Sequence, residues 1–461
     1  MDAIFDLVKN FAGTKYEDIP GAAVEAAKKE VLDSLATALG GSSKAGVGEL
    51  VDMVKEWGGN EQSTIIAYGI KCPTPNAAQV NGTMIHALDY DDGHPVALVH
   101  IGCVAVSTCF AVAERMGKTN GKEFITAIAL GGDFLSRLGL ASRPGTSALG
   151  AGWHPTTLFG FLGAAAMAGR IMGLDEERMV NALGLAYHQC GGAGSGVGDG
   201  ALAKRMGPGL AAKAGVTAAL MAERGITGER NSLEGREGRG GLYNVYMGGD
   251  YDVKILTDDL GKRFEGVNIG DKPYPCCGFT HPFIDATFAL ISRHDIKAEQ
   301  VQEIMAYGGQ TAYAMSQSPD KRAPRTIVDA QFSVPWTVAT ALVKGKVSVE
   351  DFTDEAIKRE DILETAQKVT GQLDPSMDRH GVGPGRVTIV MKDGAEYTEE
   401  IEHALGSVEK PMTFEDCAVK FRECSSSSIK PLPADTVEKV IELIGQLEQL
   451  DDATEPIRLL G

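Results

Sequence analysis

Small residues on the apolar faces of helix-like segments are the feature that most constrains this fold. Gly160, Gly163 and the all-alanine run 164–166 lie within one such segment, 157–172. Small side chains let helix axes approach closely, so this segment predicts a tightly packed helical bundle. Apolar residues at three- and four-residue spacing predict further helices over 21–39, 124–140, 175–188 and 209–224.

The composition changes after about residue 267. Prolines and glycines crowd the stretch 273–282, and strand-like runs follow at 302–307, 386–391 and 397–401. The last two runs flank a turn with Asp393-Gly394 at its centre, which is typical of a β-hairpin. A helical pattern over 326–342 lies between the strands, so this part of the chain predicts an α+β domain.

Helical patterns occur at both ends of the chain, because an amphipathic stretch returns at 436–447 after Pro433. A chain of 461 residues is too long for one ordinary core. We therefore predict a mainly α fold with an α+β part. A large all-helical domain is built from both chain ends, residues 1–266 and 408–461, and a smaller α+β lid domain, residues 267–407, is inserted between them.

The charge balance narrows the range of partners. The chain has 44 basic and 62 acidic residues, which gives a net charge of −18. Such a surface repels nucleic acid and anionic membranes, so we expect neither as a partner. An anionic substrate would need a local basic pocket, which makes lysines and arginines near histidines informative.

The N-terminus and the cysteines predict a reduced, cytoplasmic protein. Residues 1–6 lack the basic and long apolar regions of a signal peptide, and the longest apolar runs are too short and too rich in Gly and Ala to span a bilayer. The eight cysteines form no CxxC pair, which argues against a zinc ribbon and favours buried thiols.

The densest group of chemistry-bearing residues lies between His86 and His100. Three carboxylates and three histidines fall in this stretch: His86, Asp89, Asp91, Asp92, His94 and His100. A carboxylate can orient an imidazole and raise its basicity, so the cluster suits proton transfer. A solvated acidic helix end and a metal site are the alternatives, although no HExxH or Glu-x-x-His pattern supports a metal.

Two further groups lie downstream. His154 immediately precedes a predicted helix, whose N-terminus would attract a carboxylate; a capping or core histidine is the alternative. The glycine-rich stretch 194–200 precedes Lys204 and Arg205. Because no strand precedes it, we reject a dinucleotide fingerprint and expect a flexible loop that delivers both cations to an anionic substrate. A surface basic pair is the alternative for these two residues.

Lys272 opens a fourth group, 272–281, on a proline-stiffened loop at the predicted domain junction. A lysine on such a loop can face a cleft. Cys276 or Cys277 could act as a nucleophile with His281 only if the fold brought them into a catalytic arrangement, which sequence does not reveal.

Taken in order, these segments resemble the MmgE/PrpD family, which includes 2-methylcitrate dehydratase, cis-aconitate decarboxylase and iminodisuccinate epimerase. The matching pieces are 88–92 with His94, Pro95 and His100, then 154–156, 203–205, the loop 272–275 and the run 329–333. The likeness covers nearly the whole chain. It implies a helical domain from both chain ends with an inserted lid, a homodimer without metal or cofactor, and an active site in the cleft between domain and lid.

By this resemblance, Asp89, His100, His154, Lys204 and Lys272 are the predicted catalytic residues. The two lysines would bind substrate carboxylates, His100 and His154 would move protons, and Asp89 would orient a histidine. The predicted substrate-binding residues are His94, Arg205, Tyr274 and Trp336, and no residue is predicted to bind a metal.

The resemblance also implies a reaction class, proton transfer at a carbon beside a carboxylate. We predict a lyase similar to 2-methylcitrate dehydratase, acting on a hydroxy di- or tricarboxylic acid. The alternatives are an isomerase that epimerises an acidic carbon of a substituted succinate, as iminodisuccinate epimerase does, and a non-catalytic carboxylate-binding protein. The chain departs from the family pattern at 101–102, at 206–209, at Cys276-Cys277 and at Trp336, where decarboxylases carry a tyrosine. These departures argue against transferring the decarboxylase activity to this chain.

Overall fold

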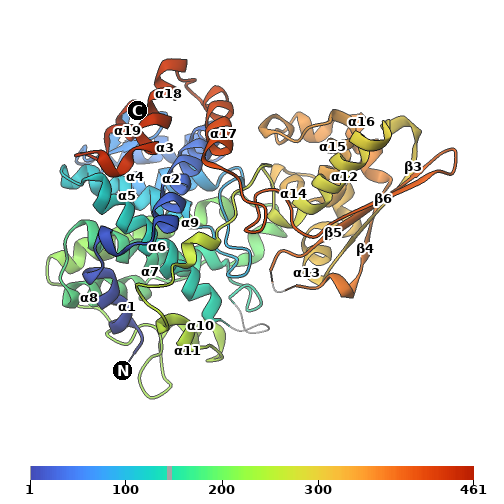
Figure 1. The fold of residues 1–461 in the computed structure, drawn as a ribbon. Helices are drawn as coiled ribbons and strands as arrows, with labels where there is room; N and C mark the ends of the chain where they lie inside the picture. The colour runs from blue at the N-terminus through green and yellow to red at the C-terminus, as the bar shows by residue number, and fades with distance from the viewer. Residues whose placement is uncertain (1, 143–147, 380) are drawn as a thin grey trace.

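The computed structural model describes residues 2–142, 148–379 and 381–461, which form a helical body and a smaller lid (Figure 1). The body contains α1 Ile4–Gly13, α2 Gly21–Gly41, α3 Val47–Trp57, α4 Thr74–His86, α5 Gly102–Met116, α6 Gly121–Ala141, α7 Pro155–Ile171, α8 Glu176–Tyr187, α9 Ala203–Glu223, α10 Leu242–Met247, α11 Val253–Thr257, α17 Phe414–Ser426, α18 Ala434–Gly445, α19 Glu455–Leu459 and the short antiparallel strands β1 Ser63–Ile65 and β2 Ile70–Cys72. The predicted mainly α fold with an α+β part is confirmed.

The body is built from both ends of the chain. Its hydrophobic core takes residues from 3–264 and again from 412–460, and α17 and α18 pack against α2 (Figure 1). Backbone hydrogen bonds tie the last residues to early segments: the amide of Ala67 donates to the carbonyl of Leu460 over 2.7 Å, and that of Gly121 to Leu450 over 2.8 Å. The exact domain limits at 266 and 407 stay a prediction.

Small residues bring the central helices into close contact, as their sequence predicts. Helix α9 packs against α4 and α7. At Gly215 on α9, an added Cβ would lie 2.7 Å from the carbonyl oxygen of Phe161 on α7, too close for any side chain. The helix interface therefore needs glycine at this position.

The lid contains α12 His281–His294, α13 Gln310–Ala312, α14 Ile327–Gln331, α15 Val334–Lys344, α16 Glu360–Gln367, β3 Val301–Gly308, β4 Val369–Leu373, β5 Gly385–Met391 and β6 Glu396–Ile401. The strands form one sheet in the order β4-β3-β5-β6, with β3 and β4 parallel and the other pairs antiparallel. Helices α12 and α15 supply Phe283 and Val338 to a core shared with the sheet (Figure 1).

The structure differs from the predicted elements at three places. The helix predicted over 326–342 is two helices, because Ser333 begins α15 anew: its Oγ accepts the amide of Trp336 over 2.9 Å. Strand β4 was not predicted from the sequence. Helix α9 begins at Ala203 and contains Pro208, a residue that weakens a helical pattern, whereas the predicted start was 209.

Helix α6 is the described helix that is long and apolar enough to cross a membrane by length and composition. Its side chains are almost all buried inside the body. Such burial is typical of the core helix of a soluble protein.

Candidate active site

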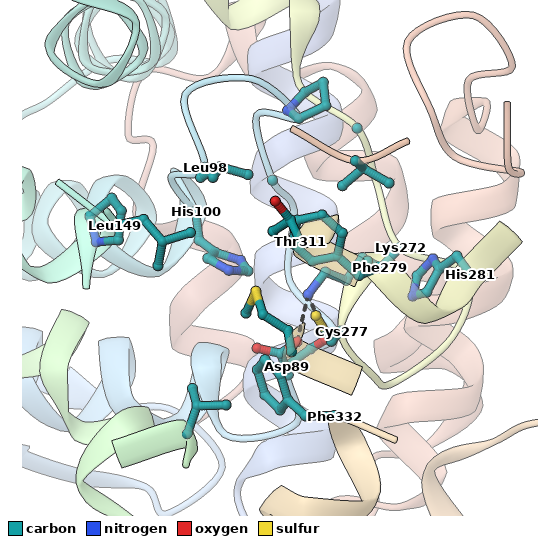
Figure 2. A pocket seen from close by; sticks show the side chains of 18 of the residues that line it. Asp89, Leu98, His100, Leu149, Lys272, Cys277, Phe279, His281, Thr311 and Phe332 are labelled. Atoms are coloured by element: carbon teal, nitrogen blue, oxygen red, sulfur yellow. Dashed lines mark hydrogen bonds and ion pairs between the residues drawn. The ribbon is translucent and has the colours of Figure 1, made fainter. Parts of the chain in front are cut away.

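A cavity of about 700 Å³ lies where body and lid meet. Of the predicted site residues, Asp89, His94, His100, His154, Lys204 and Lys272 line it. Figure 2 shows His100 and Leu149 on one side of this space, with Lys272, Phe279 and His281 facing them. The fold thus gathers into one cavity residues that are up to 183 positions apart in the sequence.

Asp89 lies in the turn that follows α4 and has a φ of 51°, in the left-handed region. Aspartate and asparagine tolerate this conformation better than most residues. The turn directs the Asp89 carboxylate to two ammonium groups: one oxygen accepts from Lys204 and the other accepts from Lys272 over 2.9 Å (Figure 2). Lys272 also donates to the Asp89 carbonyl over 2.8 Å.

Lys204, Asp89 and Lys272 form a triad in which each charge stabilises the opposite one. Burial alone would raise the pKa of Asp89, but the ammonium groups of Lys204 and Lys272 outweigh it and hold that pKa well below its usual range. Burial lowers the pKa of Lys272, yet the Asp89 carboxylate more than compensates and raises it above the ordinary value. Asp89 is therefore an anion and Lys272 a cation across the neutral pH range.

Two distant parts of the chain hold the Asp89 turn. Lys420 on α17 donates to the carbonyl of Tyr90 over 2.6 Å and to that of Lys272 over 3.1 Å. Gln331 at the end of α14 donates to the carbonyl of Leu88 over 2.6 Å. Helix α17 and the lid thus both contact residues 88–90, so the geometry of this turn depends on the assembled fold.

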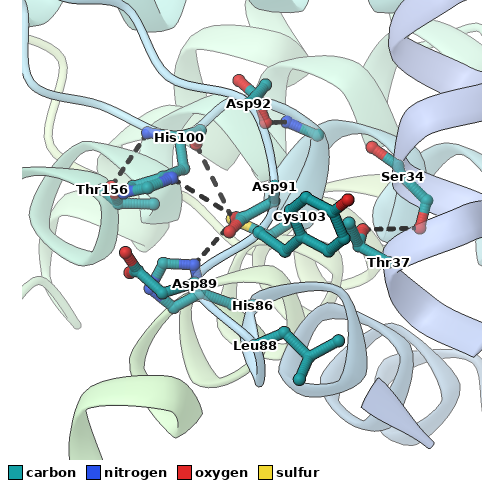
Figure 3. A network of polar contacts seen from close by, with 12 residues as sticks. Ser34, Thr37, His86, Leu88, Asp89, Asp91, Asp92, His100, Cys103 and Thr156 are labelled. Atoms are coloured by element: carbon teal, nitrogen blue, oxygen red, sulfur yellow. Dashed lines mark hydrogen bonds and ion pairs between the residues drawn. The ribbon is translucent and has the colours of Figure 1, made fainter. Parts of the chain in front are cut away.

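Three imidazoles lie close together in the site, and Figure 3 shows two of them, His86 and His100, beside Asp91. The ring centre of His86 is 4.6 Å from that of His100 and 5.6 Å from that of His154. One oxygen of Asp91 lies 2.8 Å from Nδ1 of His86 and 3.4 Å from Nδ1 of His100. Asp91 therefore orients the histidines, a role that the sequence led us to assign to Asp89.

The start of α7 positions two of the histidines that line the cavity, His100 and His154. Nδ1 of His154 shares a hydrogen bond of 2.7 Å with the hydroxyl of Thr157, and the backbone amide of His100 donates to the hydroxyl of Thr156 over 3.0 Å. Burial, reinforced by nearby Lys204, holds the pKa values of His154 and His86 well below 6.5. For His100, burial lowers the pKa well below 6.5 although Asp91 opposes the shift. The rings are thus uncharged at neutral pH and able to accept a proton.

In the described part of the chain, Asp92 and His94 hold the backbone of residues 92–102 in place and form no ion pair with Lys204 or Lys272. The Asp92 carboxylate accepts the amides of Ile101 over 2.7 Å and Gly102 over 2.9 Å at the N-terminus of α5. Burial and the neighbouring Asp91 raise the pKa of Asp92 to about 7. His94 lines the cavity, but its Nδ1 accepts the amide of Ala97 over 3.1 Å inside a turn, and burial lowers its pKa to about 4.

The other three predicted substrate-binding residues are not among the described residues that line the cavity: Arg205, Tyr274 and Trp336. Arg205 is buried and donates to the carbonyl of Ala45, while the Tyr274 hydroxyl donates to Asp285 over 2.6 Å. Trp336 is fully buried in a core of the lid. Lys204 lies in the first turn of α9 and not on the flexible loop that we expected.

The cysteine pair on the lid loop has a buried environment. Burial raises the pKa of Cys277 to about 11, and burial also raises that of Cys276. Nε2 of His281 lies 3.1 Å from the carbonyl oxygen of Cys276, not against either thiol. A thiol in this state is a poor nucleophile, so proton transfer by the histidines is the better assignment.

His86, Asp89 and His100 also have ligand atoms within 4.8 Å of one another, a spacing that a metal ion could use. However, Asp89 already binds two ammonium groups, and their charge repels a divalent cation. The same charges attract a carboxylate, so the donor set fits an anionic substrate better than a metal.

Comparison with known proteins identifies the family. The model of the MmgE/PrpD N-terminal domain matches residues 6–254, and that of the MmgE/PrpD C-terminal domain matches residues 274–446. The chain belongs to the MmgE/PrpD family. MmgE/PrpD relatives include a cis-aconitate decarboxylase of Aspergillus terreus, which is 28% identical over 96% of this chain and 93% of its own length. The cis-aconitate decarboxylases of Homo sapiens and Mus musculus are 27% and 26% identical, each over 97% of this chain and over 92% and 91% of their own lengths. This MmgE/PrpD protein is accordingly an enzyme with lyase-type activity.

Two residues of this MmgE/PrpD site were not selected from the sequence, His86 and Asp91. Both belong to the cluster between His86 and His100, so its density marked the right segment. Their contact depends on how the chain turns after α4, which residue spacing does not reveal.

Proposed function

We propose that this enzyme is a cofactor-independent dehydratase of a hydroxy di- or tricarboxylic acid. The observation that carries the proposal is that the Lys204–Asp89–Lys272 triad and the uncharged His100 and His154 line one cavity. Cations next to neutral bases suit removal of a proton from the carbon beside a carboxylate, because the resulting enediolate is anionic.

In the proposed reaction, Lys204 and Lys272 bind the substrate carboxylate and stabilise the enediolate. An imidazole of His100 or His154 accepts the proton as the C–H bond breaks. The C–O bond on the adjacent carbon then breaks, the hydroxyl takes up a proton and leaves as water, and a C=C bond forms. Asp91 holds His86 and His100 in position throughout.

A second candidate is epimerisation of an acidic carbon. It is favoured because His100 and His154 both line the cavity as uncharged bases, and a two-base mechanism needs one base for each face of the carbon. Decarboxylation is suggested by the names of the relatives. Trp336, which stands where we expect decarboxylases to carry a tyrosine, is buried in the core of the lid and is not among the described residues that line the cavity, so it does not separate decarboxylation from dehydration.

One experiment separates these reactions. The purified enzyme is incubated in deuterated water with citrate, 2-methylcitrate, cis-aconitate and substituted succinates, and the products are followed by NMR. Dehydration creates alkene signals and ultraviolet absorbance, decarboxylation shortens the acid by one carbon, and epimerisation exchanges deuterium into the substrate without elimination. A non-catalytic binding protein leaves every acid unchanged.

Variants test the assigned residues. We expect His154→Ala and Lys204→Met to lose at least about 10²-fold in kcat/KM, the range for one acid–base or charge-stabilising group. Lys430→Met, at an exposed position, is the matched control and should keep wild-type kinetics. Near-normal turnover in both active-site variants would refute the assignment.

We also propose that the enzyme is a cytoplasmic homodimer, as the family resemblance implies. The measurement is light scattering during size-exclusion chromatography. A mass of twice 48.7 kDa is expected, and a mass of 48.7 kDa would contradict the proposal.

A further inference from the structure

The cavity is larger than the proposed chemistry needs. Its volume of about 700 Å³ lies in the range of sites that enclose drug-sized ligands, whereas citrate and 2-methylcitrate are much smaller. The reactive groups gather at one end, around Asp89, Lys204 and His100. The remaining space must therefore hold another part of the substrate or water.

Apolar side chains cover much of the cavity surface, and one of them, Phe332, reaches the reactive end, where its ring centre lies 5.2 Å from the Lys204 ammonium. We call this set the apolar wall: Leu98, Leu149, Phe279, Met315, Phe332 and Leu405. Phe279 and Phe332 form a small hydrophobic cluster against which Leu98 of the body and Met315 of the lid pack. Figure 2 shows Leu98, Leu149, Phe279 and Phe332 around the space that His100 also faces.

The position of the apolar wall marks it as a binding surface. The body contributes Leu98 and Leu149, and the lid contributes the other members, so the surface exists only where the two meet. Leu405 is 36% exposed at this surface. Water against such side chains is unfavourable, and an apolar ligand group that displaces it gains free energy.

The charges that line the cavity give the same indication. Among the lining residues that the structure describes, three lysines face three aspartates: Lys204, Lys272 and Lys321 against Asp89, Asp271 and Asp320. Asp271 is paired with Lys29 over 2.6 Å, and Asp320 lies near Lys321, so the lining charges leave an excess of one cation, at the Lys204–Asp89–Lys272 triad. They suit a ligand whose carboxylates lie at one end and whose other end is uncharged.

We propose that the substrate is a carboxylic acid with an apolar substituent of several carbons, whose carboxylate binds Lys204 and Lys272 and whose substituent lies on the apolar wall. This inference rests on the proposed function for the carboxylate end. It adds the substrate class, an alkyl- or aryl-substituted acid instead of citrate itself.

The test uses acids that lack a hydroxyl group and therefore cannot be dehydrated. Succinate, methylsuccinate, propylsuccinate and pentylsuccinate are titrated into the enzyme, and Kd is measured by calorimetry. Each buried methylene is worth ~0.8 kcal/mol, so we expect Kd to fall about 4-fold per added methylene until the wall is covered. The heat capacity change should become more negative along the series.

A matched pair of variants locates the effect. Met315→Gln keeps the side-chain length but makes the apolar wall polar, and should reduce the gain per methylene. Met53→Gln makes the same change at an exposed position on α3 and should leave the gain unaltered. A gain that survives Met315→Gln in full would overturn the placement of the substituent.

The outcomes separate this inference from the proposed function. A Kd that is flat across the four acids overturns the inference, even if short hydroxy acids are turned over. A clear chain-length gain supports it, even if no hydroxy acid is dehydrated and the proposed reaction fails. If neither the succinates nor the hydroxy acids bind, both the inference and the proposed function are overturned.

Discussion

Replacing Asp89 with asparagine is the most direct test of the charge arrangement in this site. The Asp89 side chain is 4% exposed, and the side chains of Lys204 and Lys272 are 8% and 9% exposed. Asp89→Asn leaves two buried ammonium groups without their shared anion. Asparagine tolerates the left-handed conformation at this position, so the variant adds no backbone strain.

The expected loss follows from the burial. Removing one partner of a buried ion pair costs about 3–5 kcal/mol. For 461 residues, an unfolding entropy of about 2.1 cal/mol/K per residue gives roughly 1 kcal/mol/K, so Tm should fall by about 3–5 °C when body and lid unfold together. The measurement is calorimetry at neutral pH, with Asp354→Asn as the control at an exposed position.

The pH dependence of this difference has a definite sign. The folded-state pKa of Asp89 is depressed, so its stabilisation is complete above the ordinary value of 3.8 and is lost as the pH falls through the lower folded value. The difference in Tm between wild type and Asp89→Asn should therefore be constant from about pH 5 to pH 8. Succinate should raise the Tm of Asp89→Asn more than that of the wild type, because its carboxylate replaces the missing anion. A Tm within about 1 °C of the wild type would refute the reasoning.

Three other predictions follow from the contacts of the site and the body. Because burial holds the pKa of His100 well below 6.5, the kcat/KM of the wild type should stay level from about pH 8 to pH 6, and a fall with a midpoint near 6.5 would contradict this. Asp91→Asn loosens the histidines without removing them, so kcat should fall by at least about 10²-fold while KM changes little; equal kcat values would contradict the orienting role. Gly121→Ala should destabilise the body by about 1–3 kcal/mol in denaturant unfolding, because its Cβ would overlap the carbonyl oxygen of Leu447, whereas Gly13→Ala, with open space around it, should be close to neutral.

Hydrophobic periodicity predicted the longest helices of the body, α2, α6, α7 and α9, whose apolar patterns extend over several turns. The segments 21–39 and 175–188 correspond to α2 and α8 within a few residues. The break between α14 and α15 was missed, since it depends on a single capping serine inside an apolar pattern. Strand β4 was missed because it is short and pairs only with β3 at the edge of the sheet.

The candidate site was only partly predictable for a different reason. Residue types marked the segment between His86 and His100, and order along the chain linked it to Lys204 and Lys272. Sequence does not show the direction of a side chain in an irregular turn. Arg205 illustrates the limit: it is adjacent to Lys204, yet the helix turns it towards Ala45 and away from the cavity.

The three carboxylates between His86 and His100 each bind different partners, and this division determines which groups of the site are charged. Asp89 neutralises the two lysines, Asp91 orients the imidazoles, and Asp92 accepts the amides at the start of α5. If Asp89 contacted the histidines instead, their basicity would rise and the lysines would lose their counter-ion. With the observed arrangement, an arriving carboxylate shares the lysines with Asp89 while the histidines stay uncharged. In the proposed reaction, the site would thus bind an anion and remove a proton from it without first deprotonating its own base.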